Sequence, residues 1–104
     1  MASGLRISVL ERLQPSPVVS LNRAVAVAMV EGPQPALALI DRAAASGDLD
    51  NYHLLYAARA DLLRRQGSFA EAGNNYVRAL ALVSNESERR FLERRLREVQ
   101  LSEA

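Results

Sequence analysis

Apolar residues recur at intervals of three and four along most of the chain, which is the spacing of one face of an α-helix. Stretches with this spacing are separated by short clusters of proline, glycine and serine, which are typical of helix boundaries. Alanine, leucine, arginine and glutamate dominate the stretches, and all four are good helix formers. The pattern predicts an all-α protein of about six helices, at residues 5–14, 17–31, 33–45, 51–66, 68–83 and 86–100.

The connections between these predicted helices are very short. Short connections force consecutive helices to run antiparallel, so the segments should pack as helical hairpins. The chain has 104 residues, enough for one domain with one modest core. The expected organisation is a single domain at 1–104, with a first hairpin at 17–46, a second hairpin at 51–83, and capping helices at 5–14 and 86–100.

Local signals mark the ends of several helices. Ser68 with Glu71, and Asn85 with Glu88, have the three-residue spacing of a capping box, in which each residue bonds to the other's backbone N–H. Gly67 stands where a helix commonly ends in a left-handed residue. We therefore expect a tight turn at Gly67 and a side-chain cap at the start of each of the last two helices.

The second predicted helix, at 17–31, is apolar around most of its circumference. A helix of this kind usually lies between neighbours and not at the surface. We therefore expect it to be sandwiched inside the fold. The apolar residues concerned are Val18, Val19, Leu21, Ala24, Val25, Val27, Ala28 and Met29.

The hairpin at 51–83 resembles a tetratricopeptide repeat, a 34-residue helix–turn–helix with small residues where the helices cross. The matching positions, counted from His53, are Tyr56, Ala60, Gly67, Phe69, Ala72, Tyr76, Ala79 and Leu82. Arg59 and Ser84 depart from the pattern, which usually has leucine and proline there. The hairpin at 17–46 repeats the spacing more weakly through Ala36, Ile40 and Ala43. Stacked hairpins of this type form a short right-handed superhelix.

Charge and composition narrow the classes of partner. The 13 basic residues, all of them arginine, nearly balance the 12 acidic ones, for a net charge of +1. A dedicated nucleic-acid binder usually has a clear basic excess, so we expect no direct nucleic-acid contact. The longest apolar run, at 24–30, is far short of the ~20 residues that cross a bilayer. No secretory signal and no cysteine are present, so we expect a cytoplasmic protein without membrane partners.

Catalytic equipment is not apparent in the sequence. His53 is the only histidine, and a lone histidine at a helix start is most often structural. No glycine-rich phosphate loop, nucleophile–base pair or group of carboxylates with metal-loop spacing is visible. We therefore expect no enzyme activity, no catalytic residue, no cofactor and no metal site.

The best candidate binding surface is the face formed by the first helix of each hairpin. On the repeat alignment this face includes Asn22, Met29, Leu54, Asp61, Arg64 and Arg65. Arg64 and Arg65 have the geometry to receive a partner carboxylate through charge-assisted hydrogen bonds. The alternative is that both are solvent-exposed cations near a helix C-terminus, where positive charge is favourable in any case.

The last predicted helix, at 86–100, is highly charged. One interpretation is a contact with polymerase or nucleic acid. Because its opposite charges are spaced four apart and largely neutralise one another, we favour a solvated cap. Its expected buried side consists of Phe91, Leu92, Leu96 and Val99.

Three strings look specific to one family. They are PSPVVSLNRAVA at 15–26, YHLLYAARADLLRR at 52–65 and ERRFL at 88–92, together with the dipeptide Gly32-Pro33. They resemble the C-terminal helical extension of a subgroup of extracytoplasmic-function sigma factors of bacterial RNA polymerase. The resemblance covers nearly the whole chain, from about Leu10 to Val99.

The resemblance implies an accessory protein-interaction or regulatory domain that acts in transcription initiation. The two DNA-reading domains of such factors are not recognisable here, so this domain would not read promoters itself. Its implied partners are the RNA polymerase core, the DNA-reading domains of the same sigma factor, or a regulator. The alternative is a free-standing tetratricopeptide-like adaptor that binds a peptide or helix of a partner. Residues 1–4 fit a native start as well as an added leader.

Overall fold

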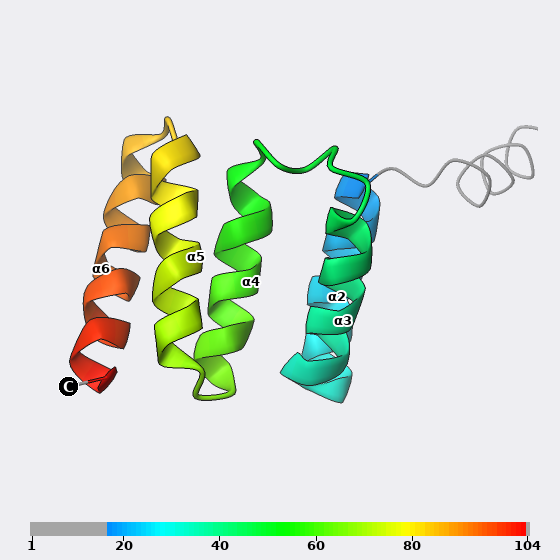
Figure 1. Ribbon diagram of the computed structural model, residues 1–104, viewed down its shortest axis with the longest axis horizontal. Helices are drawn as coiled ribbons and strands as arrows, with labels where there is room; N and C mark the ends of the chain where they lie inside the picture. The colour runs from blue at the N-terminus through cyan, green and yellow to red at the C-terminus, as the bar shows by residue number, and fades with distance from the viewer. Residues whose placement is uncertain (1–16, 104) are drawn as a thin grey trace, which may run out of the picture.

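A computed structural model describes residues 17–103, and this part of the chain is all-helical, which confirms the all-α class predicted from the sequence. Five helices follow one another within this range, with no strand among them (Figure 1). They are α2 (Pro17–Glu31), α3 (Pro33–Ala44), α4 (His53–Arg65), α5 (Phe69–Leu82) and α6 (Glu86–Glu103). The additional helix expected at 5–14 lies outside the described residues.

The turn between α4 and α5 is a Schellman motif, as the position of Gly67 predicts. Gly67 has a φ of +86°, which favours glycine. Its N–H donates to the Arg64 carbonyl at 3.1 Å, and the Ser68 N–H donates to the Leu63 carbonyl at 2.9 Å. These two bonds satisfy carbonyls at the end of α4 and reverse the chain, so α5 packs back along α4.

The turn before α4 is longer than the sequence pattern predicts. The Asp50 N–H donates to the Gly47 carbonyl at 3.2 Å, and the Tyr52 N–H donates to the Leu49 carbonyl at 2.9 Å. These turn bonds, with Leu49 buried beneath them, extend the turn as far as Tyr52. Helix α4 therefore begins at His53, two residues after the predicted start.

Only one of the two predicted capping boxes forms, and only in part. Ser68 makes no side-chain cap; its hydroxyl instead accepts from Gln66 Nε2 at 3.1 Å, so that prediction was wrong. At the start of α6, the Glu88 N–H does donate to Asn85 Oδ1 at 3.0 Å. The Glu88 carboxylate does not return to Asn85, because it lies 2.8 Å from His53 Nε2 of α4.

Each helix packs against the next one along the chain (Figure 1). Helices α4 and α5 pack most extensively against each other. Ala60, Ala72 and Ala79 are fully buried where these two helices meet. Small side chains let two backbones approach, as the repeat pattern requires. Arg59, which departs from that pattern, pairs with Asp41 of α3 at 3.0 Å and so links the neighbouring helices α3 and α4.

The buried side chains form two clusters. One lies between α2, α3 and α4, and the other lies between α4, α5 and α6. Leu37 and Tyr56 pack against both clusters and join them. Tyr56 is also tied to the preceding turn, since its hydroxyl donates to the Asp50 carbonyl at 2.7 Å. Helix α4 is thus the element that both clusters share.

The prediction that α2 is sandwiched between neighbours was wrong for the described part of the chain. Met29 is 81% exposed and Val30 is 86% exposed, and Val18, Val19 and Val25 are also exposed. The reason is that α2 packs mainly on α3 and touches α4 only along one edge. Its buried stripe therefore contains only Leu21, Ala24 and Ala28.

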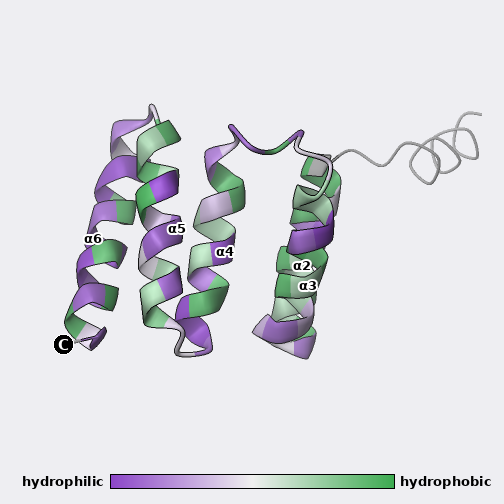
Figure 2. Ribbon diagram, in the orientation of Figure 1, coloured by the Kyte–Doolittle hydropathy of each residue, from purple (hydrophilic) through white to green (hydrophobic). Residues whose placement is uncertain are grey.

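Helix α6 extends three residues beyond the predicted end and is largely hydrophilic, with apolar positions among its charged ones (Figure 2). Leu92 and Val99 are buried, as expected. Phe91 is 47% exposed, so its expected burial was wrong. None of the helices in the described region has the length and apolar character needed to span a bilayer.

Candidate functional site

A groove of about 400 Å³ opens between α2, α4 and α6, with α5 behind it. Its wall is mainly apolar at one end and carries charged side chains at the other. The residues that line it are Leu21, Asn22, Val25, Leu54, Ala57, Ala58, Asp61, Arg64, Arg65, Tyr76, Phe91 and Arg95. We call this feature the central groove.

The structure brings five of the six sequence-predicted site residues to the central groove: Asn22, Leu54, Asp61, Arg64 and Arg65. The sixth, Met29, lines a smaller adjoining hollow of about 100 Å³ between α2 and α4. Asp61 and Arg65 line both hollows. The face chosen from the repeat alignment is therefore a continuous concave surface.

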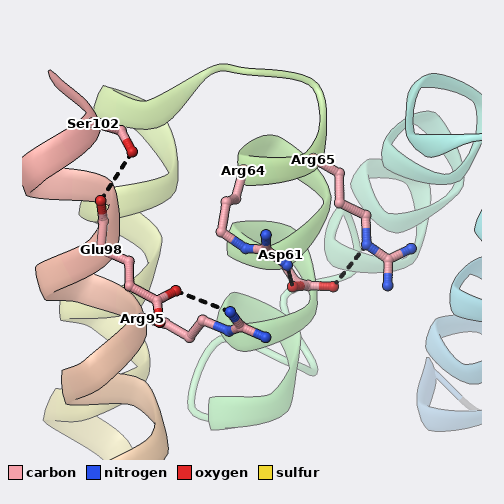
Figure 3. Close-up of polar contacts among 6 residues, drawn as sticks. All are labelled: Asp61, Arg64, Arg65, Arg95, Glu98 and Ser102. Carbon is pink, nitrogen blue, oxygen red and sulfur yellow. Dashed lines mark hydrogen bonds and ion pairs between the residues drawn. The ribbon is translucent and has the colours of Figure 1, made fainter.

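Asp61 forms ion pairs with two arginines at the charged end of the groove (Figure 3). Arg64 Nη2 donates to Asp61 Oδ1, and Arg65 Nε lies 3.2 Å from Asp61 Oδ2. The hydrogen bond that Arg64 donates to Asp61 raises the pKa of Arg64. The expectation that both arginines stand ready for a partner carboxylate needs correction, because each already pairs with one oxygen of Asp61.

Seven groove residues were not predicted as site residues from the sequence. Three of them come from the last two helices: Tyr76 of α5, and Phe91 and Arg95 of α6. Arg95 extends from α6 toward α4, with Nη1 bonded to Glu98 Oε2 at 2.9 Å (Figure 3). Its guanidinium carbon lies 5.2 Å from the centre of the Phe91 ring, a cation–π distance. The four-residue spacing of Phe91 and Arg95 is the sequence signal that could have placed both on one face.

Three hydrogen-bonding groups at the charged end have no partner among the described residues. They are the Tyr76 hydroxyl, Arg64 Nε and Arg95 Nε, and all three atoms are buried. Tyr76 is only 1% exposed, and this burial raises the pKa of its phenol. Buried polar groups in proteins are nearly always hydrogen-bonded, so three buried atoms without a partner, on residues that line one groove, are unusual.

A second, almost wholly apolar hollow of about 190 Å³ continues the groove between α4 and α6. We call it the apolar slot. It shares Leu54, Ala57 and Phe91 with the central groove. His53 and Glu88 lie at its edge, 2.8 Å apart, where they join the starts of α4 and α6.

The arrangement offers binding chemistry. It combines an apolar wall with hydrogen-bond donors and an excess of positive charge, which suits a ligand that carries both apolar and anionic groups. Within residues 17–103, no three side chains of the metal-ligating types gather closely enough to hold an ion.

Comparison with known proteins gives one informative match. The chain is 45% identical over 87 residues to an uncharacterised protein of Rhizobium meliloti (strain 1021). The match covers 84% of this chain and 20% of that protein, so the chain spans about a fifth of the relative's length. No family model matches the chain, and no solved structure matches it.

Proposed function

We propose that this chain is the accessory protein-binding domain of a bacterial extracytoplasmic-function sigma factor, and that the central groove is its binding site. The proposed architecture is a short tetratricopeptide-like, right-handed superhelical stack that acts in the cytoplasm. The observation that carries the proposal is the groove itself, which lies on the first-helix face that such repeats use for binding.

The sigma-factor context is supported by the three strings at 15–26, 52–65 and 88–92. The Rhizobium meliloti relative is compatible with it, because the matched segment occupies a fifth of a much longer protein. A protein of that size has room for separate DNA-reading domains. In this proposal the domain does not read DNA, and it docks on the polymerase core, on the DNA-reading domains or on a regulator.

The groove favours a protein ligand over a nucleic acid. Its wall contains Leu21, Val25, Leu54 and Phe91, which suit apolar side chains. The chain as a whole has a net charge of only +1, which gives little of the long-range attraction that draws a protein to a phosphate backbone. The second candidate, a free-standing adaptor for a peptide or helix, would use the same groove with an unrelated partner.

A pull-down tests the proposal. The tagged 104-residue chain is incubated separately with the matching RNA polymerase core and with the DNA-reading domains of the sigma factor. Binding to either partner supports a role in transcription initiation. Absence of binding to both, with a helical circular dichroism spectrum, would favour the adaptor function.

A substitution in the groove wall shows whether the groove is responsible. Leu54→Arg places a long cation where the central groove and the apolar slot meet, and it should abolish binding. Val77→Arg is the matched control, because Val77 lies on α5 outside both hollows and is 53% exposed. Equal binding by the two variants would remove the groove from the proposal.

A further inference from the structure

We propose that the charged end of the central groove is a subsite for a carboxylate of the partner protein, and that the apolar slot holds an apolar side chain of the same segment. This inference rests on the proposed function, since it names the chemistry that the groove recognises. Tyr76, Arg64 and Arg95 form the carboxylate subsite, and Phe91 and Leu54 form the wall of the slot.

The first argument is the set of unused donors. The Tyr76 hydroxyl, Arg64 Nε and Arg95 Nε come from three different helices, are buried, and have no partner among the described residues. Arginine nitrogens can only donate, and the single phenol oxygen, which can also accept, cannot serve both Arg64 and Arg95. A ligand that brings acceptor oxygens would satisfy the donors that remain.

The second argument is charge. Three arginines line the groove against one aspartate. Both oxygens of that aspartate, Asp61, are already engaged by Arg64 and Arg65. Arg95 is partly neutralised by Glu98, which does not line the groove. A positive excess therefore remains in a part-buried place, where a partner carboxylate gains charge-assisted hydrogen bonds.

The third argument concerns Tyr76. Its ring fills the core between α4, α5 and α6, and phenylalanine would fill that space equally well. The hydroxyl makes no well-formed hydrogen bond within residues 17–103, although Arg64 lies close enough to lower the pKa of the phenol against the effect of burial. A ligand-binding role explains why tyrosine stands at a position that packing alone would give to phenylalanine.

The spacing of the two subsites defines the partner segment. Phe91 and Arg95 are four residues apart on α6, a rise of about 6 Å, and Ala57 and Arg64 are seven apart on α4, a rise of about 10 Å. A matching segment would present an apolar and an acidic side chain about 6–10 Å apart. Those are positions one or two turns apart on a helix, or two to three residues apart on an extended chain.

A peptide-binding experiment tests the inference with the 104-residue chain. The probes are labelled helical peptides with a leucine followed four or seven residues later by glutamate, and the same peptides with glutamine replacing the glutamate. The glutamate peptides should bind at least about tenfold more tightly, because charge-assisted hydrogen bonds typically contribute that much affinity. Fluorescence anisotropy gives the dissociation constants.

Variants assign the preference to the subsite. In Tyr76→Phe and in Arg95→Met the advantage of the glutamate peptides should shrink toward one. In the control Arg90→Met, an exposed arginine of α6 outside the groove, it should stay unchanged. The urea midpoint of Tyr76→Phe should not fall, whereas a purely structural hydroxyl would lower it.

Several results would overturn the inference. They are equal binding of the two kinds of peptide, no binding of either, or a preference that survives in both subsite variants. Tighter binding of a single-stranded RNA oligonucleotide than of the glutamate peptides would also overturn it. If Leu54→Arg blocks the pull-down while Tyr76→Phe and Arg95→Met bind normally, the subsite fails and the proposed function stands. If Leu54→Arg binds normally in the pull-down, the proposed function and this inference both fail, because Leu54 lines the central groove and the apolar slot.

Discussion

Gly73→Ala should stabilise the protein, and the reason lies in how α5 packs on α6. Gly73 is buried in the interior of α5, where glycine costs about 1 kcal/mol relative to alanine. An added Cβ would meet Val99 Cγ2 at 3.7 Å, Leu96 Cδ1 at 3.8 Å and Glu103 Oε1 at 3.8 Å, which are ordinary van der Waals distances. The new methyl therefore fits without movement, and the free energy of unfolding should rise by about 1 kcal/mol.

Gly67→Ala makes the same chemical change with the opposite expectation. Nothing lies within 4 Å of the added Cβ, so crowding plays no part. The φ of +86° is in the region that L side chains rarely adopt, and the substitution should cost about 1–2 kcal/mol. The two variants separate backbone conformation from packing.

Urea unfolding followed by circular dichroism measures both effects. The midpoint should move up for Gly73→Ala and down for Gly67→Ala, with the slope unchanged. A lower midpoint for Gly73→Ala would show that α6 lies too close to α5 for the added methyl, and it would refute the packing of the α4–α5–α6 cluster. A Gly67→Ala midpoint equal to that of the original protein would refute the turn geometry.

Three further predictions concern the same region. Ala79→Leu should overpack the crossing of α4 and α5 and lower the unfolding free energy by about 1–3 kcal/mol in urea titrations, because Ala79 is fully buried. Asn85→Ala should cost about 1 kcal/mol through loss of the cap on the Glu88 N–H, while Ser68→Ala, whose hydroxyl caps nothing, should cost less. Burial raises the pKa of Tyr76 above its ordinary value of 10.0, so the unfolded chain loses that proton first. Stability measured by urea unfolding should therefore fall as the pH rises above 10, and Tyr76→Phe should weaken the fall.

The sequence predicts the helices well where local signals mark their ends. Pro17, Gly32 and Pro33 bound α2 and begin α3 as expected, since proline and glycine act on the backbone within a residue or two. The end of α6 was predicted too early, because residues 101–103 continue the helix and contain no proline or glycine that would end it. The exposure of α2 was missed because an apolar circumference does not reveal whether a neighbour is present on each side.

The candidate site could be predicted in part from the sequence. The repeat alignment predicts that Leu54 and Arg64 share one face because both belong to the first helix of a hairpin, and both do line the central groove. Tyr76 was assigned to the core, and its ring does lie there, but only the tertiary structure shows that the residue also lines the groove. Phe91 was missed because α6 has two apolar sides, one on α5 and one open to the groove.

Site-directed photo-crosslinking tests the central claim, that the central groove is the surface that binds the partner. A photo-crosslinking amino acid replaces Phe91 in one sample and Val77 in another, since both positions are exposed and only Phe91 lines the groove. After illumination with the RNA polymerase core or the DNA-reading domains, we expect a crosslinked product from position 91 and none from position 77. A product from position 77 alone would place the partner outside the central groove and contradict the account.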